Sequence, residues 1–142
     1  MRAHEYLSQI KSMDIKIRQK QQEADSIIFG LQGRGIDYSA DKVQSSPEDQ
    51  MASAMARYAD IIDEIKTDID TFVRTKHRII EQIQALPDVR HITVLYDAYV
   101  LYMPRDMIGE SMGYSPEWIS ELKGQALTAF ETTYTNLHEP ML

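Results

Sequence analysis

Apolar residues recur at helical spacing along two long stretches of the chain, at steps that alternate between three and four residues. Each stretch is interrupted once by a lysine. A mean period of 3.5 residues is that of a coiled-coil seam, so we expect two long helices paired as an antiparallel hairpin. The predicted seam positions are Tyr6, Ile10, Met13, Ile17, Lys20, Ala24, Ile27 and Leu31 in the first stretch, and Met51, Met55, Tyr58, Ile62, Ile65, Ile69, Phe72, Lys76, Ile79, Ile83 and Leu86 in the second.

The second stretch carries its own start and stop signals. Ser46 can cap a helix whose first turn contains Pro47, and Pro87 ends the pattern after Leu86. Between the two stretches lies LQGRGIDYSADKVQSSP, which is too rich in Gly, Ser and Asp to continue a helix. This segment is therefore predicted to connect the two helices of the hairpin.

The two lysines that interrupt the seams are either breaks in packing or devices that set the register. In an antiparallel hairpin Lys76 lies near the start of the first helix, and Lys20 lies near the middle of the second. Asp14, Asp63 or Asp70 could then supply a carboxylate partner for one of them.

The last third of the chain is predicted to consist of short helices. Asp88 can cap a helix that runs to about Met103, and Pro104 separates it from the next one. No strand-like alternation of useful length occurs anywhere. The expected fold is all-α, with a coiled-coil-like helical hairpin over residues 1–87 and a small domain over residues 88–142.

The stretch RDMIGESMGYSPEWISELKG, residues 105–124, fits a helix-turn-helix. A small residue is needed where the two helices touch, which is Gly109, and a residue that tolerates positive φ is needed at the turn, which is Gly113. Ser115 then caps a second helix that runs to about Tyr134. The residues predicted to form the core of the motif are Ile108, Gly109, Met112, Gly113, Tyr114, Ile119 and Leu122.

In a DNA-binding helix-turn-helix, the second helix enters the major groove and its exposed side chains meet the bases. A glutamate can accept a hydrogen bond from cytosine N4, and a serine can serve a base or a phosphate. Arg90 and His91 add positive charge nearby. The predicted DNA-binding residues are Arg105, Ser115, Glu117, Trp118, Ser120, Glu121 and Lys123. The alternative is a helical hairpin with the same turn and no role at DNA.

Charge works against DNA binding. The chain has a net charge of −7, and residues 88–142 hold three Lys or Arg against eight Asp or Glu. DNA-binding domains usually carry a basic surface, because neutralising phosphates supplies much of their affinity. A helical protein-interaction module, for example a partner of RNA polymerase, therefore stays open beside the DNA-binding reading.

The order of motifs resembles a known family. The connector YSADKVQSSP, the segment IQALPDVRHITVLYDAYV and the core MIGESMGYSPEWISELKGQALTAF are similar to those of the ArpU and RinA late-gene regulators of Gram-positive phages and prophages. Their C-terminal part is similar to region 4 of bacterial sigma factors. The resemblance implies a transcriptional regulator of phage late genes, with promoter or operator DNA and host RNA polymerase as partners. The chain departs from the family at Glu117, Trp118, Ser120 and Glu121, where such proteins commonly carry Arg, Lys or His.

Catalytic, metal and cofactor sites are not predicted. The histidines at 4, 77, 91 and 138 are scattered, and Glu81, four residues after His77, indicates a surface pair rather than a metal site. The GRG sequence at 33–35 lacks the Lys-Ser/Thr of a phosphate loop. Ser45 and Ser46 have no histidine base nearby in sequence. We expect no enzymatic activity.

Composition also bounds location and assembly. The chain has no cysteine, its N-terminus lacks the apolar core of a secretory signal, and no apolar run is long enough to span a membrane. These features favour the cytoplasm, without membrane association; the family resemblance implies that of a bacterial host cell. Two long apolar seams are more surface than a small domain can cover, so we expect a homodimer.

Overall fold

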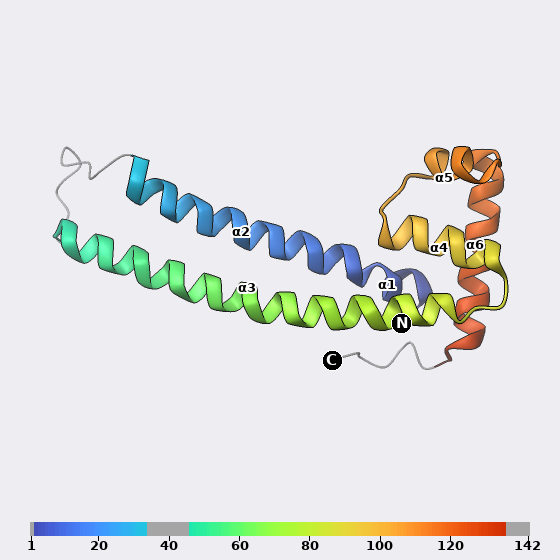
Figure 1. The fold of residues 1–142 in the computed structure, drawn as a ribbon, viewed down its shortest axis with the longest axis horizontal. Coiled ribbons are helices and arrows are strands. Elements are labelled where there is room, and N and C mark those ends of the chain that lie inside the picture. The colour runs from blue at the N-terminus through green and yellow to red at the C-terminus, as the bar shows by residue number, and fades with distance from the viewer. Residues whose placement is uncertain (1, 34–45, 136–142) are drawn as a thin grey trace. The chain divides into compact units, whose positions relative to one another are not determined.

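The computed structural model describes residues 2–33 and 46–135. Every regular element within these ranges is a helix, which confirms the predicted all-α class. Most of the connector and the HEPML tail lie outside the described residues. The elements are α1 (Ala3–Leu7), α2 (Gln9–Gly33), α3 (Pro47–Gln84), α4 (Val89–Leu95), the π-helical turn η2 (Tyr96–Val100), α5 (Arg105–Met112) and α6 (Pro116–Thr133), as Figure 1 shows.

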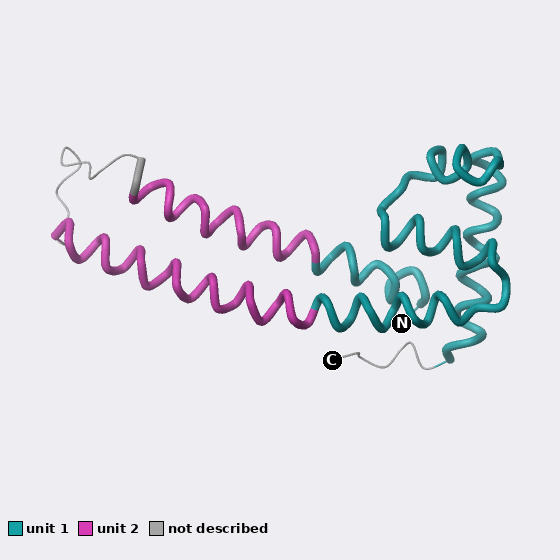
Figure 2. Tube along the Cα trace, in the orientation of Figure 1, with its two compact units in different colours: residues 1–13, 72–142 teal, residues 14–71 magenta. Residues whose placement is uncertain are grey.

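The chain divides into two compact units (Figure 2). Unit 1 comprises residues 1–13 and 72–142, and unit 2 comprises residues 14–71. This division differs from the predicted one at residue 87. Its cause is the core of unit 1, in which residues from α1 and from the end of α3 join those of the short C-terminal helices.

Unit 2 consists of the antiparallel parts of α2 and α3. Ile17 and Ala24 of α2 are buried, as their predicted seam positions require. On α3 Ile65 is buried as predicted, but the neighbouring positions differ from the predicted seam: Ile61 is buried and Ile62 only partly, and Ile69 is 39% exposed. Met51 and Met55, also predicted in the seam, are exposed. At these two steps of α3 the covered residue therefore lies one position before the predicted Ile62 or Ile69.

Ion pairs between one lysine of α2 and two carboxylates of α3 accompany this difference from the predicted seam. Lys20 Nζ lies 2.6 Å from Asp68 Oδ2 and 3.2 Å from Glu64 Oε1. These hydrogen bonds raise the pKa of Lys20, with Asp68 the larger cause. Asp68 takes the seam place predicted for Ile69 and pairs there with the lysine of the opposing seam.

The predicted carboxylate partners of the seam lysines were wrong. Asp14 pairs with Arg18 at 3.1 Å on its own helix. Lys20 does lie opposite the middle of α3, as predicted, but it reaches Glu64 and Asp68. Lys76 lies 5.5 Å from the centre of the Phe72 ring.

The core of unit 1 joins α1, the end of α3 and the C-terminal helices. Tyr6 of α1 donates a hydrogen bond to Gln82 Oε1 at 2.5 Å, and Tyr134 donates to the Gln82 carbonyl at 2.8 Å. Phe130 of α6 packs against both tyrosine rings, with ring centroids 5.9 Å from Tyr6 and 4.7 Å from Tyr134. The side chains at the centre of this core are fully buried: Tyr6, Leu7, Ile10, Ile79, Ile83, Val94, Leu95, Ile108, Ile119, Leu122 and Phe130.

The helix after Pro87 begins as predicted but ends earlier. Asp88 caps α4 by accepting a hydrogen bond from the Arg90 backbone N–H at 2.9 Å. Regular α-helix stops at Leu95, the chain widens into η2, and Tyr102 adopts a positive φ of 58°. The predicted end at Met103 was therefore wrong. Pro104 disfavours helical geometry at Met103, and the positive φ of Tyr102 ends the helical backbone one residue earlier.

Candidate nucleic-acid interface

The turn between α5 and α6 is built on two glycines. Gly113 has a φ of 80°, a left-handed conformation that side chains rarely adopt. Gly109 is buried, and a Cβ atom added to it would lie 2.5 Å from the Tyr114 carbonyl oxygen and 3.4 Å from Ile119 Cγ1. The backbone N–H groups of Gly113 and Tyr114 both donate to the Gly109 carbonyl, at 2.8 and 2.9 Å. Gly109 and Gly113 thus have the roles predicted for them.

Ser115 starts α6 as predicted. Its hydroxyl accepts a hydrogen bond from the Trp118 backbone N–H at 3.1 Å, and Pro116 is the first helical residue. Proline suits that position, since the N–H it lacks would have no partner inside the helix. The cap and the turn together set where the exposed side chains of α6 begin.

The predicted core residues of the motif divide into two groups. Ile108, Ile119 and Leu122 are buried and belong to the core of unit 1, and Met112 packs partly buried against it. Tyr114 keeps 36% of its surface exposed, and its ring lies edge-on to Trp118 with centroids 6.4 Å apart. Tyr114 therefore forms an aromatic pair at the surface.

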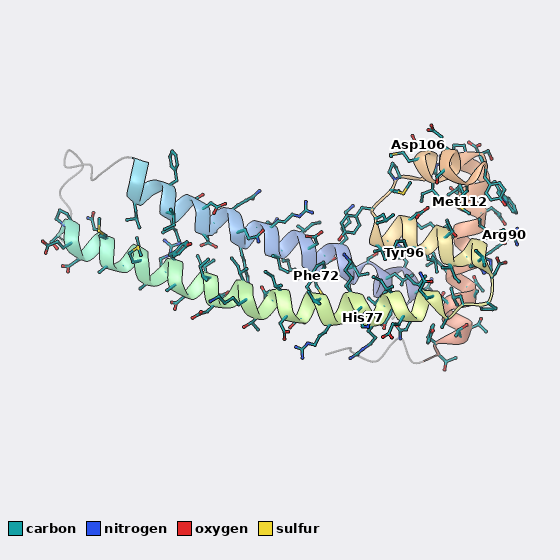
Figure 3. The ribbon with its side chains drawn as sticks, viewed as in Figure 1. Phe72, His77, Arg90, Tyr96, Asp106 and Met112 are labelled. Carbon is teal, nitrogen blue, oxygen red and sulfur yellow. The ribbon has the colours of Figure 1, made fainter. Side chains whose placement is uncertain are left out.

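The exposed side chains at the start of α6 form the front of the candidate interface. We call Glu117, Trp118, Ser120 and Glu121 the α6 front; all four are exposed. Arg105 of α5 joins this front, since its Nη1 donates to Ser120 Oγ at 2.8 Å. The next residue along α5, Asp106, is exposed and is labelled in Figure 3.

Lys123 lies apart from the α6 front, although it was predicted to contact DNA. Its side chain is half-buried, and its Nζ lies 5.0 Å from the centre of the Tyr99 ring. Burial lowers the pKa of Lys123 and raises that of Tyr99 to about 12. The Tyr99 hydroxyl is in turn hydrogen-bonded to His4 Nδ1 at 2.7 Å. This lysine is therefore part of the packing between α6 and η2.

The other basic residues near the motif, Arg90 and His91, lie close to the Asp88 carboxylate. Arg90 Nη2 lies 3.2 Å from the Asp88 carboxylate, and His91 Nε2 lies 3.7 Å from it. Hydrogen bonds from Arg90 hold the pKa of Asp88 below its usual range. The pKa of Arg90 is raised mainly by Asp88 and to a smaller extent by the Tyr114 hydroxyl. Arg90 thus lies close to the aromatic pair with its charge partly neutralised.

The described ranges contain no cluster of three or more His, Cys, Asp or Glu that could hold a metal ion. His77 Nε2 lies 3.4 Å from Glu81 Oε1, and both side chains are largely exposed, so this is the surface pair that their spacing predicted. None of the described helices carries an apolar stretch long enough to cross a lipid bilayer.

Three of the seven predicted DNA-binding positions would have needed tertiary information to judge. The pairing of Arg105 with Ser120, and the burial of Lys123, depend on how α5, α6 and η2 pack, and no spacing rule indicates either. Comparison with known proteins adds no further assignment: no family model, no curated protein and no solved structure matches this chain.

Proposed function

We propose that the chain is a transcriptional regulator that binds double-stranded DNA through α6, without a catalytic step. The observation that carries the proposal is the construction of the turn. A buried glycine at 109, a left-handed glycine at 113 and a serine cap at 115 hold two helices close together and expose the first turns of the second helix. A helix presented in this way can enter the major groove.

The chemistry of the α6 front suits base edges better than phosphates. Glu117 and Glu121 can accept hydrogen bonds from cytosine N4, and Ser120 can serve a base or a phosphate. Trp118 offers an apolar edge for a thymine methyl group. Arg105 supplies the positive charge of this face and can bind either a phosphate or guanine.

The resemblance to phage late-gene regulators supports a role at promoters. It implies control of late genes, with host RNA polymerase as a further partner. The few cations near the α6 front then require most of the affinity to come from base contacts, because little phosphate charge is neutralised.

Fluorescence anisotropy with labelled duplexes tests this function. The duplexes are the region upstream of the protein's own gene and a scrambled copy, each at several salt concentrations. Each phosphate contact contributes about −0.9 to the slope of log affinity against log salt, so we expect a shallow slope of about −2 to −4. Equal affinity for both duplexes at every salt concentration would refute the proposal.

Two single variants separate the α6 front from the neighbouring core. Arg105→Gln should weaken binding to both duplexes and make the salt slope shallower by about one. Lys123→Gln removes the same charge a short distance away and serves as the matched control, since its amine faces Tyr99. A larger effect from Lys123→Gln than from Arg105→Gln, with both variants folded, would place the contact surface elsewhere.

The carboxylates give a third test. Replacing both Glu117 and Glu121 with glutamine removes repulsion from phosphates, so non-specific affinity should rise while the preference for the upstream region falls.

A second candidate function is protein recognition without DNA. The Tyr114–Trp118 pair is an exposed aromatic surface flanked by Glu117 and Glu121, and aromatic residues are enriched where proteins bind one another. This candidate predicts no preference between duplexes in the wild type, and only weak, sequence-blind binding in the double glutamine variant.

A further inference from the structure

Helix α3 carries a second apolar face in unit 2. The face toward α2 follows residues 54, 58, 61, 65 and 68, which are buried or partly buried. The residue that follows each of these positions belongs to a second set, which we call the outer face of α3: Met55, Ala59, Ile62, Lys66 and Ile69. Successive helical residues are turned by about 100°, so the outer face points about 100° away from α2. Met55 and Ile69 are 46% and 39% exposed on it.

The outer face has the pattern of a helix-pairing seam. Its steps alternate between four and three residues, as in a coiled coil, with apolar residues at every place except Lys66. Helix α2 has no such second face. From Met13 to Ala24, the residues that follow its buried seam by one position are polar: Asp14, Arg18, Gln21 and Asp25. Helix α3 is thus the helix of unit 2 built to have two helical neighbours.

Charge favours one orientation for a second copy of α3 packed on this face. In a parallel pair of identical helices, Lys66 would face Lys66 of the other copy inside the seam. In an antiparallel pair, Lys66 instead packs against Ile62 of the other copy, and its amine can reach the Asp63 that follows. The two-fold axis then brings together two lysines and two aspartates in alternation. Within the described ranges, neither Lys66 nor Asp63 has an ion pair of its own.

We propose that the outer face of α3 is the homodimer interface, with the two α3 helices antiparallel and Lys66 of each copy opposite Ile62 of the other. The long lysine stem covers apolar surface while its amine stays at the edge of the seam. This interface does not depend on whether α6 binds DNA.

Mass measurement on the full chain tests the interface. Light scattering after size exclusion should give twice the 16.4 kDa of one chain at micromolar concentration. The double variant Met55→Glu/Ile69→Glu changes two exposed positions of the outer face, and we expect at least a tenfold weaker dimer, since buried unpaired charge opposes association. Ile15→Glu on α2, whose side chain is 44% exposed, is the matched control and should stay dimeric.

A monomeric wild type, or a double variant that dimerises as tightly as the wild type, would overturn the proposal. Circular dichroism establishes that each variant keeps its helix content. Should the double variant lose its helices, the orientation experiment decides instead, because it leaves the outer face unchanged.

Spin labels test the orientation. The chain has no cysteine, so Ser53→Cys and Thr67→Cys each give one label per copy at an exposed position of α3 outside the outer face. In the antiparallel dimer the two labels at position 53 lie roughly 30 Å apart along the axis, and those at 67 about 9 Å, because each residue adds about 1.5 Å. Nearly equal distances at both positions would indicate parallel pairing and overturn the proposed arrangement.

Discussion

Gly109→Ala adds one methyl group to α5. Its effect on the free energy of unfolding should show whether the close contact at this position outweighs the higher helix propensity of alanine. In an exposed helix, glycine to alanine stabilises by about 1 kcal/mol. At Gly109 the added Cβ would lie 2.5 Å from the Tyr114 carbonyl oxygen, which is backbone and cannot swing away as a side chain would. The turn would have to move, yet the Tyr114 N–H is bonded to the Gly109 carbonyl at 2.9 Å. The same shift therefore strains that hydrogen bond as well.

The expected size of the effect follows from these opposing contributions. Overpacking costs about 1–3 kcal/mol, against a propensity gain of about 1 kcal/mol, so Gly109→Ala should lower the free energy of unfolding by up to about 2 kcal/mol. Gly124 on α6 is the matched control. A Cβ added there meets nothing within 4 Å, so Gly124→Ala should raise the free energy of unfolding by up to about 1 kcal/mol.

Urea unfolding at a fixed protein concentration measures both variants. Trp118 is the sole tryptophan, and it lies on α6 next to the turn, so its fluorescence reports on unit 1 directly. Gly109→Leu should lose more stability than Gly109→Ala and should lose any preference for the cognate duplex, while most helix content remains. If Gly109→Ala is as stable as Gly124→Ala, the close approach of α5 to the turn does not exist as described.

Two further predictions concern pH and hydrogen bonding in unit 1. Asp88→Ala removes the cap of α4 and should lower the urea midpoint of unfolding, whereas Asp88→Asn, whose side-chain oxygen can accept the same hydrogen bond, should keep most of the cap. The pKa of Asp88 is lowered in the folded state, so the stabilisation from its charge is present above the usual aspartate pKa and is lost as pH falls through the folded-state pKa. In acid denaturation, the wild type should therefore lose its stability advantage over Asp88→Asn. Burial raises the pKa of Tyr99 to about 12, so its neutral form favours folding fully below pH 10 and this contribution fades as pH rises toward 12. An absorbance titration of tyrosinate should lose its latest step in Tyr99→Phe, and an unchanged titration would contradict the burial of that hydroxyl.

The helix boundaries could be predicted because they depend on local chemistry. Ser46 and Ser115 accept hydrogen bonds from backbone N–H groups three residues ahead, and Asp88 accepts one from two residues ahead. The left-handed Gly113 ends α5 in the same local way. Such signals act within one or two turns, so they can be read in order along the chain.

The end of the helix after Asp88 was harder to predict. The start was local, but the widening at Tyr96–Val100 and the positive φ of Tyr102 reflect how this segment packs in unit 1. Pro104 alone requires only that the helix end before it.

The exposed residues of the candidate site could also be predicted from the sequence, but the surroundings of each side chain could not. Glu117, Trp118 and Glu121 are exposed, as their spacing on α6 predicts. Lys123 has the same polar character in sequence, yet its amine faces Tyr99, a residue of a different helical segment. A lysine is amphipathic, so its spacing cannot say whether its stem follows the surface or the core.

Order along the chain was enough to establish the all-α class, the caps, the turns and the presence of two apolar seams. Packing decided which of two neighbouring faces of α3 meets α2, since the faces differ by one residue and both satisfy the same alternation of three and four. Packing also decided that Lys20 pairs with Glu64 and Asp68, and that α1 belongs to unit 1. The physical reason is that periodicity describes one helix at a time. A contact between helices depends on volumes and charges from segments far apart in sequence, and those meet only in the folded chain.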